Sequence, residues 1–303
     1  MHDLIVPEYR YNKVSSEQAF EFSSAGEGFF AQDDPKTDDN AYDEKKHDFG
    51  LIKDSWETLM KDFEQLRKEA DTNTRYKLLF LGRHGQGYHN LAILKYGQEA
   101  WDEKWSKLNG DGETVWGPDP ELTGLGVQQA KDNNTAWKEQ LPKGIPKPEI
   151  FYVSPFIRAI DTMQYTFDDI FLNVGNSRVS PPLVVEDLRE DNGEHTCDSR
   201  SKKSQLAARF PRVVFEDGFP EDDETWRPDW RESFEEHKVR TRRFLNKLFA
   251  LDWDEPLEKQ AKYVSVTSHS GTIATFLGCI GHREFSLGTG GMIPVIVKAT
   301  KRS

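Results

Sequence analysis

Five short, continuous apolar runs, each bounded by turn-forming residues, constrain the fold of this chain more than any other feature. The runs cover residues 76–82, 149–154, 182–187, 262–268 and 291–299. Because apolar residues occupy consecutive rather than alternate positions, both faces of the resulting strands must be buried, which is typical of parallel sheets covered by helices. Helical apolar periodicity separates several runs, at residues 123–141, 231–251 and 270–280. The pattern predicts an α/β fold, a three-layer α/β/α sandwich on a mostly parallel sheet.

Residues 1–75 are predicted to form an N-terminal extension that packs on this core. The stretch from Phe29 to Leu51 mixes turn-forming and charged residues and has little apolar periodicity. A metal site in its acidic run is one interpretation, but a solvated charged loop is favoured. Residues 55–70 repeat apolar side chains at helical spacing behind Ser55, a residue suited to cap a helix. We expect that helix to pack on the sandwich and the main domain to span residues 76–303.

Charge and composition restrict the partners and the compartment. The formal net charge of −12 means that most of the surface would repel nucleic acid and anionic membranes, so neither is expected as a partner. No apolar run approaches the roughly 20 residues of a membrane span, and the first residues lack the apolar segment of a signal peptide. Cys197 and Cys279 are too few for a disulfide framework. These features favour a cytoplasmic protein, with the nucleus as an additional location.

Polar clusters follow three of the predicted strands. Arg83, His84 and Gly85 end the first run, Arg158 follows the second in SPFIRAIDT, and His269 follows the fourth in TSHSG. The carboxyl ends of parallel strands meet at one edge of a sheet, where ligands bind. Two arginines and two histidines are therefore expected to converge there.

Such a group suits a phosphoryl centre. One guanidinium group can bind two phosphate oxygens at once. A neutral imidazole nitrogen can attack phosphorus to form a covalent intermediate. Gly85 would let substrate approach the backbone closely. The predicted helix behind His269 would add its N-terminal amides to the same anion site.

The three motifs, in this order, resemble the histidine phosphatase superfamily, which includes cofactor-dependent phosphoglycerate mutases and many phosphomonoesterases. The resemblance runs from about Lys77 to about Val297. The longer strings LGRHGQGYHNLAILKYG, LREDNGEHTCDSRS and FPEDDETWRPDWRE look like its fungal phosphomutase-like branch. The resemblance implies a phosphoglycerate mutase-like fold and chemistry through a phosphohistidine.

The resemblance also implies roles for individual residues. His84 would be the nucleophile, while Arg83, Arg158 and His269 would hold the phosphoryl oxygens. His269 would donate to the phosphoryl group rather than attack it, stabilising charge in the transition state. Asn90 matches the family asparagine after the histidine and would contact phosphate or substrate.

A general acid is also needed, because the leaving alkoxide must be protonated. The family pattern L-x-E places Glu190 in this role, with Asp191 and Glu186 as competitors. Arginines nearby would lower the pKa of such a carboxyl, so partial burial must oppose them if it is to donate a proton.

Hydrolase and mutase differ in whether water or a second hydroxyl collects the phosphoryl group. The resemblance implies that a mutase needs extra cations, and that its acid is typically followed by a basic residue and YG. Here the residues after Glu190 are Asp191, Asn192, Gly193 and Glu194. Because this acidic rim should repel a bisphosphorylated acid, we favour a phosphomonoesterase acting on a small phosphorylated metabolite.

Two other functions stay open. Arg200, Lys202 and Lys203 would reverse the sign of the rim if they fold inward, which would favour a phosphomutase of the phosphoglycerate mutase type. A non-catalytic phosphate-binding module is the second alternative. Against it stands the presence of all five expected catalytic residues: Arg83, His84, Arg158, Glu190 and His269.

Substrate-binding residues are expected to be Gly85, Tyr88, Asn90 and His195, with residues 188–230 as a cap-like insertion. His89 has no motif support and is expected to be structural or exposed.

No metal and no cofactor are expected, and the oligomeric state is left open. The residues considered as zinc ligands offer no convincing geometry: they are His84, His89, His195 and Cys197.

Overall fold

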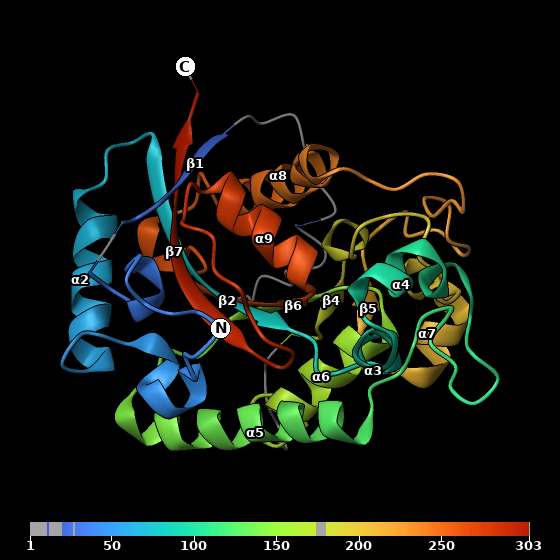
Figure 1. The fold of residues 1–303 in the computed structure, drawn as a ribbon. Coiled ribbons are helices and arrows are strands. Elements are labelled where there is room, and N and C mark those ends of the chain that lie inside the picture. Colours follow the sequence, from blue (N-terminus) through green and yellow to red (C-terminus); the bar gives the residue numbers. More distant parts are fainter. Residues whose placement is uncertain (1–10, 12–19, 27, 174–179, 303) are drawn as a thin grey trace.

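A seven-stranded sheet in the order β1-β7-β2-β6-β3-β4-β5 forms the middle of the computed structural model, which describes residues 11, 20–26, 28–173 and 180–302 (Figure 1). The strands are β1 (Phe20–Ser24), β2 (Thr74–Arg83), β3 (Ile150–Val153), β4 (Leu183–Val184), β5 (Val214–Phe215), β6 (Tyr263–Ser268) and β7 (Met292–Lys301). β7 is antiparallel to β1 and β2, whereas the other neighbouring pairs are parallel. The mostly parallel α/β sheet is as predicted.

Helices cover both faces of the sheet (Figure 1). They are α2 (Trp56–Glu69), α3 (Tyr88–Tyr96), α4 (Gln98–Glu103), α5 (Gly124–Gln140), α6 (Ile157–Phe167), α7 (Lys203–Arg209), α8 (Phe234–Ala250) and α9 (Ser270–Cys279). Seven short 3₁₀ helices accompany them among the described residues: η1 (Ala31–Asp33), η2 (Glu44–Gly50), η3 (Trp105–Lys107), η4 (Leu141–Lys143), η5 (Glu186–Leu188), η6 (Thr196–Asp198) and η7 (Leu257–Lys259). None of the described helices combines the length and apolar character that crossing a membrane requires.

The residues of β2 alternate between two hydrophobic cores. Leu79 and Leu81 join the core that α8 and α9 cover, while Leu78 and Phe80 join the core that α2, α5 and α6 cover. Continuous apolar sequence is needed because both faces are buried. β2 therefore holds its carboxyl end in the middle of the sheet, and α3, α4 and α7 gather at that end (Figure 1).

The edge strands depart from the sequence prediction. β5 was not predicted because its two residues are only half-buried and too short to produce a pattern. It lies within residues 188–230, so part of the predicted cap-like insertion belongs to the sheet. β4 ends at Val184, and residues 186–188, expected in part as strand, form η5 instead.

Described residues before α2 contact the main domain at several places. β1 pairs with β7, and the segment from Phe29 to Leu51 contacts the loop of residues 282–291 that follows α9. Arg283 Nε donates to the Gln32 carbonyl oxygen at 2.8 Å, and His282 Nε2 lies 3.0 Å from Asp33 Oδ1. The expectation of a solvated acidic run is therefore wrong for Asp33, because its carboxylate is an anchor for that loop.

Candidate active site

His84 lies at the carboxyl end of β2 with its backbone fixed on two sides. Its N–H donates to the Ser268 carbonyl oxygen at 2.9 Å, and its own carbonyl accepts from Gly290 N–H at 2.9 Å. The side chain is buried, and Nδ1 donates to the Gly85 carbonyl oxygen at 2.6 Å. Since Nδ1 carries the hydrogen, the neutral ring has its lone pair on Nε2.

The surroundings of His84 favour the neutral imidazole. Burial lowers its pKa well below the usual value, and the charges of Arg158 and Arg83 lower it further. A neutral ring with a lone pair is the form that can attack an electrophile.

Arg158 and His269 approach His84 from α6 and from the end of β6. The rings of His84 and His269 have their centroids 4.9 Å apart, and His269 Nε2 lies 2.6 Å from Ser154 Oγ. Arg158 is buried over the Phe156 ring and donates to the Cys197 carbonyl oxygen at 2.9 Å. Residues far apart in sequence are thus brought together, as the strand order predicts.

Several nitrogen atoms around this group have no partner. Arg83 is held by the Leu287 carbonyl oxygen, which accepts from one terminal nitrogen at 2.6 Å. Among the described residues, the buried atoms that lack a hydrogen-bond partner include Arg83 Nε, Arg158 Nε, His89 Nδ1 and His269 Nδ1. Buried polar atoms without partners are uncommon and costly, so this concentration marks a functional place in the fold.

The three candidate acids occupy different environments. Glu190 lies at the start of α9, where Gly271 N–H donates to Oε2 at 3.3 Å. Burial, followed by the charge of Asp191, raises its pKa. Ser270 and Gly271, which donate to Glu190, directly follow His269, so Glu190 lies beside that histidine. Asp191 is bound by His237, whereas Glu186 forms ion pairs with Arg189 and Arg200.

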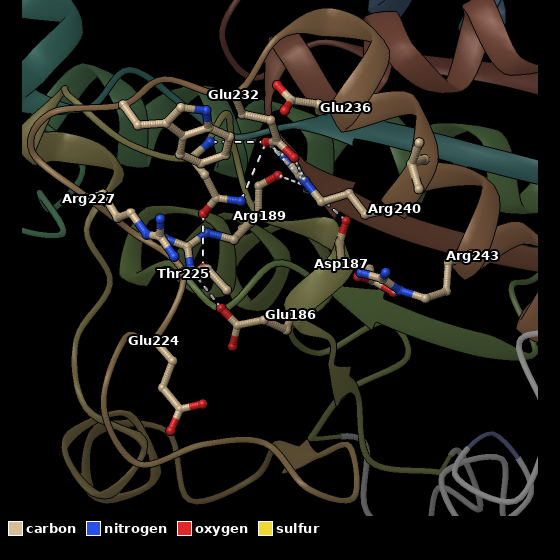
Figure 2. Close-up of a pocket in the computed structure, with 13 residues that line it drawn as sticks. Glu186, Asp187, Arg189, Glu224, Thr225, Arg227, Glu232, Glu236, Arg240 and Arg243 are labelled. Atoms are coloured by element: carbon tan, nitrogen blue, oxygen red, sulfur yellow. Dashed lines mark hydrogen bonds and ion pairs between the residues drawn. The ribbon is translucent and has the colours of Figure 1, made fainter.

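A separate cavity of about 420 Å³ is lined in part by Arg189 and Asn192, on either side of Glu190 in the sequence (Figure 2). Its described lining includes Glu186 and none of the five predicted catalytic residues. Figure 2 shows Arg240 directed at Glu232 and Arg243 at Asp187, so these cations are already paired. The cavity is therefore distinct from the site around His84.

The predicted substrate-binding residues are placed less uniformly. Asn90 Oδ1 accepts from Gly87 N–H at 2.9 Å and so caps α3, which occupies the oxygen of its amide. Tyr88 is exposed, and His195 is partly buried beside Trp101. A methyl carbon on Gly85 would lie 2.8 Å from Gly126 C, so this glycine is required by the protein's own backbone. Close packing on α5, rather than room for substrate, explains it.

Sequence reasoning missed two neighbours of the site. His89 is buried, with its ring centroid 5.4 Å from that of His84, so of the two expected roles, structural or exposed, only the exposed one is wrong. Its helical spacing from the inward residues Ala92 and Ile93 is the signal that predicts this position. Asp198 Oδ1 accepts from Arg158 at 3.3 Å, a contact across the chain that no local pattern indicates.

Comparison with known proteins identifies related chains. The profile described as histidine phosphatase superfamily (branch 1) matches residues 79–289. A probable phosphoglycerate mutase of Arthroderma benhamiae is 40% identical over 286 residues, covering 89% of this chain and 82% of its own length. A probable phosphoglycerate mutase of Saccharomyces cerevisiae is 35% identical over 256 residues, which cover 78% of this chain and 85% of the yeast protein. Phosphomutase-like protein 3 of Candida albicans is 34% identical over 275 residues, which cover 90% of this chain and 79% of the Candida protein.

Proposed function

Because the chain belongs to the histidine phosphatase superfamily (branch 1), with fungal phosphomutase-like relatives, we propose that it hydrolyses a small phosphorylated metabolite through a phosphohistidine on His84. The observation that carries this proposal is the state of His84: a buried, neutral ring whose Nδ1–H is bound to the Gly85 carbonyl, beside two arginines and His269. An anionic phosphoryl group is the kind of ligand that would satisfy the unpartnered donors of Arg83, Arg158 and His269.

In the first step, His84 Nε2 attacks phosphorus and the bond to the leaving oxygen breaks. Arg83 and Arg158 bind the phosphoryl oxygens, and His269 donates to the charge that develops on them. Glu190 supplies the proton that the leaving alkoxide needs. Burial supports this role because it raises the pKa of the Glu190 carboxyl.

In the second step, water attacks the phosphohistidine and the phosphorus–nitrogen bond breaks. Glu190, now a carboxylate, takes the proton from the attacking water. His84 leaves as the neutral ring, because Nδ1 has kept its hydrogen, donated to the Gly85 carbonyl, throughout. Inorganic phosphate is the product.

The position of the nearby cations supports hydrolysis over phosphoryl transfer to a second hydroxyl. Arg200 is buried and bound to Glu186 at 3.0 Å, and Lys202 pairs with Asp222 at 2.8 Å. Lys203 lies over the Phe215 ring, 5.7 Å from its centroid. The cations that would make the rim attractive to a bisphosphorylated acid are therefore engaged elsewhere.

A phosphomutase is the second candidate, and the names of the Arthroderma and Saccharomyces relatives favour it. Incubation with 3-phosphoglycerate and 2,3-bisphosphoglycerate, followed by phosphorus NMR, separates the two reactions. We expect inorganic phosphate to accumulate. Efficient formation of 2-phosphoglycerate would overturn the preference for a hydrolase.

The nucleophile is tested with p-nitrophenyl phosphate. His84→Ala should lose at least about 1,000-fold in kcat, because no other group is aligned to form the covalent intermediate. His47→Ala, at an exposed histidine, is the matched control and should retain the wild-type rate. Equal rates for the wild type and His84→Ala would remove His84 as the nucleophile, whereas no hydrolysis by either protein would favour the non-catalytic binding module.

A further inference from the structure

One histidine and two carboxylates meet at the N-terminus of α9. An oxygen of Glu190, an oxygen of Asp191 and a nitrogen of His237 all lie within 4.8 Å of one another. His237 is fully buried on α8, and its Nδ1 lies 2.6 Å from Asp191 Oδ1. Its Nε2 is buried and has no hydrogen-bond partner among the described residues. A polar residue on the buried face of α8 is costly, and the one side-chain hydrogen bond of His237 within the described part of the chain is with Asp191.

Gly271 makes room for both carboxyl groups. A methyl carbon at this position would overlap Glu190 Oε1, lie 3.2 Å from the Glu190 carboxyl carbon and lie 3.3 Å from Asp191 Oδ1. The two acids therefore lie against the same point of the backbone. Two carboxylates this close, in a partly buried place, do not both ionise readily.

The partners of the two acids are unequal. Asp191 accepts from His237 Nδ1 at 2.6 Å and from Arg231 at 3.4 Å. The side chain of Glu190 accepts from two backbone groups, Asp191 N–H at 3.2 Å and Gly271 N–H at 3.3 Å, and from Ser270 Oγ at the long distance of 3.5 Å. Because a cation and an imidazole N–H stabilise a carboxylate better than these contacts, the negative charge belongs on Asp191 and the proton on Glu190.

His237 is suited to donate rather than to carry charge. Burial, followed by the nearby Arg240, lowers its pKa to about 3, so the ring is neutral and offers Nδ1–H to Asp191. The other charged groups that act on Glu190 oppose one another: Asp198 favours its protonated form, and the guanidinium groups of Arg83, Arg158 and Arg231 favour its ionised form.

We propose that Asp191 and His237 are positioning residues for the reaction: His237 and Arg231 hold Asp191 as a carboxylate, and its charge keeps the adjacent Glu190 protonated for donation. The inference rests on the proposed function, because it gives Glu190 a proton to deliver. As the bond from phosphorus to the leaving oxygen breaks, Glu190 passes its proton to that oxygen. Asp191 then faces a second carboxylate, which makes Glu190 a better base toward the attacking water.

Asp191→Asn tests the charge while keeping an oxygen that can accept from His237. Loss of the charge should ionise Glu190 at lower pH, so the alkaline limb of kcat should move down by about one pH unit or more. In a series of aryl phosphates, the loss in rate at pH 7 should grow with the pKa of the leaving phenol, because good leaving groups need no acid. An unshifted limb and a wild-type dependence on the leaving group would overturn the proposal.

The controls separate charge from packing. Asp187→Asn removes a carboxylate of the same loop that is paired with Arg243, and it should leave the alkaline limb in place. His237→Asn, which keeps a donor near the Nδ1 position, should preserve more of the wild-type profile than His237→Leu. If His237→Leu does not fold, Asp191→Asn alone decides.

The two proposals fail in different ways. If His84→Ala hydrolyses p-nitrophenyl phosphate at the wild-type rate, the phosphohistidine reaction is wrong and Glu190 has no leaving group to protonate. If His84→Ala is inactive while Asp191→Asn keeps the wild-type pH profile, the reaction stands and only the role of Asp191 and His237 is refuted.

Discussion

Replacing Gly271 by alanine should displace Glu190, the proposed proton donor, without unfolding the protein. The added methyl carbon would overlap Glu190 Oε1 and lie 3.2 Å from the carboxyl carbon, so the carboxyl group must move by about 1 Å to restore ordinary contact. That group is the end of a flexible side chain and can swing away. Alanine is also favoured over glycine in helices by up to about 1 kcal/mol, so α9 should be no less stable.

The expected cost falls on catalysis. General acids contribute about 100-fold to 10,000-fold, and a misplacement of about 1 Å can cost about 100-fold. We therefore expect kcat for an alkyl phosphate to fall about 100-fold, which corresponds to about 2.7 kcal/mol in the barrier. The rate with p-nitrophenyl phosphate should fall much less, because its leaving group needs little help from an acid.

Steady-state kinetics with both substrates, together with thermal unfolding, measure these effects. Gly278→Ala, in the same helix, is the matched control: its methyl carbon would lie 3.4 Å from a Phe234 ring carbon, and neither rate should change. Wild-type kcat for the alkyl phosphate in Gly271→Ala would refute the placement of the acid. Equal losses of kcat for the alkyl phosphate and p-nitrophenyl phosphate, with the fold intact, would also refute the placement of the acid.

Two further predictions concern the support of the site and the response to pH. Ser154→Ala removes the hydroxyl 2.6 Å from His269 Nε2, so KM should rise and the free energy of unfolding should fall by about 1 kcal/mol, as measured by kinetics and urea titration. Burial raises the pKa of Glu216 to about 7 from 4.5, so the stability that its protonated form contributes is lost as pH rises through this interval, by up to about 3 kcal/mol. Glu216→Gln should lack that part of the pH dependence in urea titrations at pH 5 and pH 8, and identical behaviour of both proteins would contradict the shifted pKa.

Continuous apolar runs predicted the central strands because the requirement is local: every residue of such a strand must be apolar when both faces are covered. β2 shows this, with Leu78 and Phe80 in one core and Leu79 and Leu81 in the other. β1 and β5 were not predicted, because edge strands need fewer apolar residues and depend on pairing with strands that are distant in the sequence. The contact of Asp198 with Arg158 was not predicted for the same reason: the two residues are distant in the sequence.

The placement of His237 was in part predictable. It lies on the apolar stripe of α8, seven residues before Phe244, and both are buried. A histidine on such a stripe predicts a buried polar contact, because an unpaired imidazole would be costly there. Its partner Asp191 lies 46 residues away and could be found only from the packing of α8 against the loop after η5.

The loop of residues 282–291 connects the segment before α2 to the site around His84, although that segment contributes no residue to the site. Arg283 and His282 fasten this loop to Gln32 and Asp33, and the same loop provides the Leu287 carbonyl for Arg83 and the Gly290 N–H for His84. A protein that lacks the segment before α2 would keep every motif and lose these contacts with the loop. Sequence change in the segment before α2 is therefore expected to alter the support of Arg83 and His84 while the RHG motif itself stays unchanged.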